Sequence, residues 1–140
     1  MAKQKSSKSI SGDKGSSRKE RIDQVVRRAE EKRGYAPFWL RFMGEVDLEY
    51  LEAYNALYET VAARSVHLPL KYKELITVAA LAVKREDFGI GNHIKRALRL
   101  GVTKEEIVEA LQAASFHTGA LTLVHGLKSL LEVLKEQKVE

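Results

Sequence analysis

The ionisable side chains most able to perform chemistry in this 140-residue chain lie within apolar surroundings. Glu74 is near the start of the most apolar segment, and His93 is at the start of the next predicted helix. His117 and His125 flank Gly119, where we expect a break between two helices. A histidine can exchange protons near neutral pH, and a carboxylate can orient it or act as a second base. This set of residues therefore indicates proton transfer as the candidate chemistry.

Each of these residues also has a purely structural explanation. A glutamate in the first turn of a helix is favoured by the helix dipole, and a histidine near a helix start can simply bond a backbone carbonyl. Spacing alone does not bring Glu74 and His93 together, because antiparallel packing with a tight turn would place them at different ends of the helix pair. Only a bend or an offset of the helices would bring them into contact.

Other classes of chemistry are less well supported. The chain has no cysteine, which excludes disulfides, thiolate zinc sites and thiol redox chemistry of its own. His93, His117 and His125 lack the i, i+4 pair typical of a helical metal site, so their spacing is a weak metal signal. We expect no metal and no cofactor.

The elements that must position these residues are all helical. Apolar residues recur at helical spacing, and no segment has the period of two that predicts a strand. The helix over 71–85 is apolar around nearly its whole circumference, which predicts a central, buried helix. We expect an all-α fold with helices over about 19–32, 38–43, 71–85, 92–100 and 121–136. A further helix follows the cap at Asp47 and extends to Val61, and another follows the cap at Thr103 before the break at Gly119.

Several helix boundaries have specific signals. Asp47 is a predicted N-cap, and Thr103 with Glu106 forms a predicted capping box. Gly44 should interrupt the short second helix. The segment 86–91, which contains two glycines, should be a turn.

Length and charge suggest one folded domain with a basic extension. We expect residues 1–18 to be a disordered Ser/Lys-rich tail and residues 19–140 to be the helical domain. The net charge is +5, and the first 20 residues contribute +4 of it. The tail could touch nucleic acid or another acidic surface, but such compositions are usually only solvated, so a nucleic-acid partner is not expected.

The sequence contains no signal for a membrane. No apolar run approaches the roughly 20 residues that span a bilayer, and the N-terminus is polar rather than apolar. We therefore expect no membrane association and a cytoplasmic location.

Several stretches of the chain resemble the carboxymuconolactone decarboxylase family, which belongs to the alkylhydroperoxidase D-like superfamily. The resemblance extends over about 34–134. It implies an alkylhydroperoxidase D-like helical domain that assembles as a homotrimer or homohexamer. The stretches that carry it are KELITVAALA (73–82), HIKRALRLGVTKEEI (93–107), AASFHTGA (113–120), GYAP (34–37) and LEAY (51–54).

The peroxidase branch of this superfamily has a glutamate, then a Cys-x-x-Cys pair, then a histidine four residues after the second cysteine. On this chain the glutamate corresponds to Glu74 and the histidine to His93, whereas Glu86 and Gly89 occupy the cysteine positions. The resemblance therefore implies that the chain is not a thiol peroxidase. The decarboxylase branch also lacks the cysteines and keeps the glutamate and histidine.

The resemblance implies a cofactor-independent lyase that removes carbon dioxide from a small carboxylated lactone or related ring acid. His93 would be the acid/base and Glu74 its partner. Glu86 would be either a further base or a solvated turn residue. His117 and Thr118 would line the ligand pocket.

Two questions remain open at the level of sequence. A carboxylate substrate would be repelled by Glu74 and Glu86 unless a cation such as Arg85 or Arg96 intervenes, and nothing in the sequence selects that cation. The alternative to an enzyme is a non-catalytic protein of the same fold that binds a small molecule or only assembles.

Overall fold

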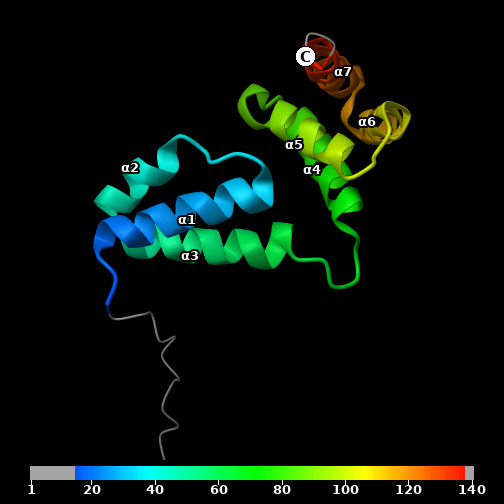
Figure 1. Ribbon diagram of the computed structural model, residues 1–140. Coiled ribbons are helices and arrows are strands. Elements are labelled where there is room, and N and C mark those ends of the chain that lie inside the picture. Colours follow the sequence, from blue (N-terminus) through cyan, green and yellow to red (C-terminus); the bar gives the residue numbers. More distant parts are fainter. Residues whose placement is uncertain (1–14, 138–140) are drawn as a thin grey trace, which may run out of the picture. The chain divides into compact units, whose positions relative to one another are not determined.

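The structure, a computed structural model, describes residues 15–137, and all regular elements in that range are helical. The all-α prediction is confirmed for this part of the chain. The predicted basic tail falls almost entirely outside it. Figure 1 shows the elements in chain order, which are α1 (Arg18–Arg33), α2 (Trp39–Val46), α3 (Leu48–Tyr58), the π-helical turn η1 (Glu59–Ala63), α4 (Leu70–Lys84), α5 (Asp87–Arg99), α6 (Lys104–Thr118) and α7 (Ala120–Glu136).

The helices form two compact units, and the boundary between the units falls after Asn55, within α3. In the N-terminal unit, Ser17 and Glu20 form a capping box that starts α1. Gly34 ends α1 with a φ of 81°, a left-handed conformation that favours glycine. The core of this unit joins α1 to α2 and α3, through Ile22, Val25, Val26, Ala29, Leu40, Leu48 and Leu51.

Gly44 does not interrupt the second helix, contrary to the expectation from its composition. It lies inside α2, where a Cβ atom would be 2.6 Å from Cγ1 of Ile22 and 2.9 Å from Cδ2 of Leu51. Close packing therefore explains this glycine better than a helix break does. The predicted N-cap at Asp47 is confirmed, because its Oδ1 accepts a hydrogen bond from the Tyr50 amide at 2.9 Å.

In the C-terminal unit, α4 packs against α5, α6 and α7, so its predicted central place is confirmed. The prediction that α4 is completely buried is not confirmed. Glu74, Val78 and Ala82 form a buried stripe at a spacing of four residues, whereas Ile76 and Val83 are 60% and 41% exposed. The apolar circumference of α4 is therefore only partly covered by the chain itself.

The predicted turn over 86–91 is largely helical. The Glu86 side chain accepts a hydrogen bond from the Phe88 amide at 2.9 Å and caps α5, which begins at Asp87. Gly89 and Gly91 lie inside this helix. A glycine in a helix costs only about 1 kcal/mol, which the burial of apolar side chains in the same helix can offset.

The last two helices follow the sequence signals closely. Thr103 and Glu106 form the predicted capping box at the start of α6, and Gly119 separates α6 from α7 with a φ of 98°. The core of the C-terminal unit contains Val78, Ala82, Ile90, Ile94, Ala97, Val102, Ile107, Leu111, Leu130 and Val133. No helix in the described range is long and apolar enough to cross a membrane.

Candidate functional site

Glu74 is a charged residue on a stripe of α4 that is otherwise apolar. It precedes Val78 and Ala82 at intervals of four residues, so its side chain lies on the same face as theirs, and it is only 2% exposed. A buried carboxylate must be paired and hydrogen-bonded, because isolating its charge from water is costly. The partners of Glu74 therefore define the site.

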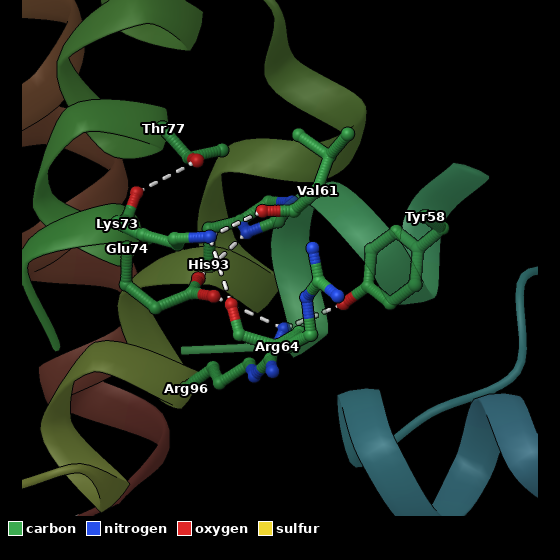
Figure 2. A network of polar contacts seen from close by, with 8 residues as sticks. All are labelled: Tyr58, Val61, Arg64, Lys73, Glu74, Thr77, His93 and Arg96. Atoms are coloured by element: carbon green, nitrogen blue, oxygen red, sulfur yellow. Dashed lines mark hydrogen bonds and ion pairs between the residues drawn. The ribbon is translucent and has the colours of Figure 1, made fainter. Parts of the chain in front are cut away.

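Those partners come from one face of α5. His93 and Arg96 are three residues apart and so lie on adjacent turns of the same helix face. Nδ1 of His93 is 2.8 Å from Oε2 of Glu74, and Nη1 of Arg96 is 3.0 Å from Oε1. Figure 2 shows both side chains converging on the carboxylate. Each oxygen of Glu74 thus has its own partner.

The earlier start of α5 explains how Glu74 and His93 meet. Because this helix begins at Asp87 rather than near residue 92, His93 is in its second turn instead of at its end. The contact needs only the ordinary antiparallel packing of α4 on α5 with two long side chains between them. The structure therefore brings together the pair whose contact the sequence left open.

Arg96 also connects the carboxylate to the end of α3. Its Nη1 donates a hydrogen bond to the Tyr58 hydroxyl at 2.5 Å. The side chain of Arg96 is only 8% exposed, so this guanidinium is held between two fixed oxygen atoms. Its positive charge compensates the charge of Glu74 inside the protein.

Lys73 fixes the turn that follows Tyr58. Its ammonium donates to the backbone carbonyls of Val61 at 2.5 Å and of Arg64 at 2.8 Å, at the end of η1 (Figure 2). These carbonyls are typical acceptors for a cation, because the end of a helical segment carries partial negative charge. A π-helical turn is rare and often occurs at a functional site. Here it joins Tyr58 to the chain segment that returns to α4.

The contact with Glu74 sets the chemistry of His93. An ionised carboxylate can only accept hydrogen bonds, so Nδ1 of the imidazole carries the proton that points to Glu74. The neutral ring then presents Nε2 as its base. No hydrogen bond from another described residue reaches this nitrogen, and the His93 side chain is 19% exposed. The arrangement can take up and release a proton at Nε2 while Glu74 stabilises the charged ring.

Among the described residues, no hydrogen bond or ion pair joins Glu86, His117 or Thr118 to this network. Glu86 caps α5 and makes no hydrogen bond or ion pair with His93 in the described range. His117 and Thr118 are exposed at the end of α6, and the Thr118 hydroxyl is 2.8 Å from that of Thr122.

The described residues contain no group of three metal-ligating side chains. His125 is close to Asp87, with 3.4 Å between Nε2 and Oδ1. An apolar groove of about 640 Å³ does lie between α6 and α7, but none of its lining residues belongs to the Glu74 network.

Sequence reasoning missed two members of the network and left a third undecided. The sequence pattern singles out neither Tyr58 nor Lys73 as a site residue. Arg96 was one of two cations considered, and its spacing of three from His93 was the available signal. Nothing local in the sequence could have identified Tyr58, because its partner Arg96 is 38 residues away.

Comparisons with known proteins agree with this architecture. A model of the carboxymuconolactone decarboxylase family matches residues 49–132, which is well over half of the chain. Among solved structures, the chain is similar to a "putative carboxymuconolactone decarboxylase" from Burkholderia xenovorans LB400, with 27% identity and a TM-score of 0.75. That similarity covers 87% of this chain and 95% of the other. No match was found among curated proteins. The chain belongs to the carboxymuconolactone decarboxylase family.

Proposed function

We propose that the protein is a cofactor-independent decarboxylase of a small carboxylated lactone or related ring acid, with His93 as the proton-transfer residue. The observation that carries this proposal is the contact between Nδ1 of His93 and Oε2 of Glu74 at 2.8 Å. It orients the ring so that Nε2 is available to a substrate. Family membership supports the reaction class, and the lack of cysteine argues against thiol peroxidase chemistry.

The proposed reaction needs one proton and no other reactant. The bond between the carboxylate and the carbon of the substrate ring breaks, and carbon dioxide leaves. The electron pair of that bond passes into the substrate ring toward its lactone carbonyl. Nε2 of protonated His93 then donates a proton to carbon, and solvent restores that proton. Glu74 stabilises the imidazolium that exists before the transfer. The net reaction consumes one proton for each molecule of carbon dioxide released.

Arg96 has a supporting role in this proposal. It pairs with Glu74, so the carboxylate that orients His93 does not present an uncompensated negative charge to an anionic substrate. Among the described residues, Glu86, His117 and Thr118 form no hydrogen bond or ion pair with Glu74 or His93, and the proposed mechanism does not depend on them.

We also propose that the chain acts as a homo-oligomer, a trimer or a hexamer. Large apolar side chains remain exposed on the helices of the C-terminal unit, such as Ile76 on α4, Phe116 on α6 and Val124 on α7. Exposed apolar area of this kind is typical of surfaces that bind another protein. Light scattering during size-exclusion chromatography measures the assembly directly, and a monomer at micromolar concentration would contradict this proposal.

The direct test of the function is release of carbon dioxide from a panel of carboxylated lactones by the purified full chain. We expect release from at least one panel member, accompanied by uptake of one proton per turnover. A thiol peroxidase assay serves as the control and should give no activity. No release across the panel would instead favour a non-catalytic protein of the same fold.

A further inference from the structure

Three residues in and beside the Glu74 network carry positively charged side chains, namely Arg64, Lys73 and Arg96. Glu74 is paired with Arg96, whereas Lys73 uses its ammonium to bind two backbone carbonyls. Arg64 is exposed, and no described carboxylate forms an ion pair with its guanidinium. The residues drawn in Figure 2 thus include three cations and one anion.

Arg64 is held in place by its backbone rather than by its side chain. It follows η1 in an extended conformation, and its carbonyl accepts a hydrogen bond from Lys73 at 2.8 Å. Figure 2 shows its side chain turned back along the segment toward the hydroxyl of Tyr58, which is the acceptor of Arg96. The Arg64 guanidinium therefore lies on the same side of the network as the hydrogen bond between Arg96 and Tyr58.

We propose that Arg64 is the specificity-determining residue that binds a carboxylate group of the substrate. This inference rests on the proposed function and identifies the cation that an anionic substrate requires. A guanidinium has a planar fork of donors that matches both oxygens of a carboxylate, and an exposed arginine without an ion pair has those donors available. Figure 2 shows this guanidinium on the Tyr58 side of the network, and Tyr58 connects through Arg96 to the carboxylate that binds His93.

Arg85, the other candidate cation, is unsuited to this role by its position. It lies beyond the far end of α4, eleven residues after Glu74, which is roughly 16 Å along a helix axis. Arg96 is also unsuited as the main recognition group, because its charge already compensates Glu74 and its side chain is buried. Arg64 has neither limitation.

The hydrogen bonds of Lys73 fix the backbone from which the Arg64 side chain extends. These two hydrogen bonds hold the carbonyls of Val61 and Arg64, so the backbone that carries the guanidinium does not need to be ordered when ligand binds. Binding by a pre-positioned group loses less conformational entropy than binding by a mobile one.

The experiment compares two ligands and two matched variants. The probes are a five-membered lactone bearing a carboxylate and the methyl ester of the same compound. Their affinities for the full chain are measured by calorimetry, and the His93 ring resonances are followed by NMR. The variants are Arg64→Gln and Arg85→Gln, which each remove one exposed guanidinium from the C-terminal unit. Circular dichroism and thermal unfolding verify that both are folded.

We expect the acid, but not the ester, to bind the wild-type chain and to shift the His93 resonances. Arg64→Gln should weaken binding of the acid by about tenfold or more, whereas Arg85→Gln should leave it unchanged. Arg64→Lys should restore part of the loss, since an ammonium keeps the charge without the planar fork.

Three results would overturn the assignment: equal binding of acid and ester, a loss confined to Arg85→Gln, or no binding of the acid by the wild-type chain. Because calorimetry reports affinity and the decarboxylation assay reports release of carbon dioxide, the two results are read separately. A protein that binds the acid through Arg64 but releases no carbon dioxide would refute the proposed enzyme and retain this recognition site.

Discussion

One oxygen of the Glu74 carboxylate lies 2.8 Å from Nδ1 of His93, although 19 residues of sequence separate the two. The other oxygen contacts Arg96 at 3.0 Å. The carboxylate is therefore shared between a group that can transfer protons and a group that compensates charge. This division of the two oxygens makes Glu74 the residue on which both the chemistry and the local stability depend.

The first prediction concerns the proton-transfer residue. If the proposed function is correct, His93→Ala should lower the rate of carbon dioxide release by roughly 10²–10⁴-fold, the usual contribution of a general acid or base. Glu74→Gln should also lower the rate, because the amide cannot stabilise an imidazolium as a carboxylate does. The matched control is His67→Ala, which removes an exposed histidine in the connector before α4. Equal activity of His93→Ala and wild type would exclude the mechanism.

The second prediction concerns the buried ion pair. Glu74→Ala and Arg96→Ala each leave one buried charge without its partner, so each should lower the free energy of unfolding by about 3–5 kcal/mol. The double variant should lose clearly less than the sum of the two, because neither charge is then left uncompensated. Urea unfolding followed by circular dichroism measures the free energy of unfolding of the two single variants and the double variant. Additive losses would show that the two residues do not interact energetically.

The third prediction compares two glycines in the C-terminal unit. A Cβ atom at Gly126 would be 2.3 Å from Cδ2 of Leu111, which is completely buried, so Gly126→Ala should destabilise the protein by about 1–3 kcal/mol. Gly89 lies inside α5 with its nearest neighbour, Cδ1 of Leu81, at 3.8 Å. Gly89→Ala should therefore stabilise the helix by about 0.5–1 kcal/mol. The unfolding temperature should fall for Gly126→Ala and rise for Gly89→Ala. Shifts of the same sign would contradict the packing at these two positions.

The fourth prediction concerns pH and the N-terminal unit. The hydrogen bond from the Arg41 guanidinium lowers the pKa of the Asp23 carboxyl below its ordinary value of 3.8. A lowered pKa means that the pair stabilises the folded state above the unfolded pKa, and that this contribution disappears as the pH falls through the folded pKa. The stability difference between wild type and Asp23→Asn should therefore be constant between pH 7 and 5 and shrink in more acidic solution.

Unfolding in urea at several pH values measures this difference, and Arg41→Gln should remove the same pH dependence. Both side chains are partly solvated, so the effect should be small and should weaken in high salt. A difference that grows as the pH falls would have the wrong sign for this explanation.

The sequence predicted those parts of the fold that depend on local interactions. The capping box at Thr103 and the cap at Asp47 are both present, since each requires only a side chain and an amide three residues later. The expectations for Gly44 and Gly89 were wrong, because composition cannot distinguish a helix break from a glycine inside a helix. Gly44 packs closely against Ile22 and Leu51, whereas Gly89 has room for a Cβ atom.

By itself, the sequence determined the all-α class, most helix boundaries, the absence of thiol chemistry and the identities of Glu74 and His93 as candidate partners. Only the tertiary structure decided that these two residues touch, that Arg96 rather than Arg85 pairs with the carboxylate, and that Tyr58 and Lys73 belong to the same network. The physical reason is the range of the interactions. Helix periodicity and capping act over three or four residues, whereas the pairing of a buried carboxylate depends on which helix faces pack together.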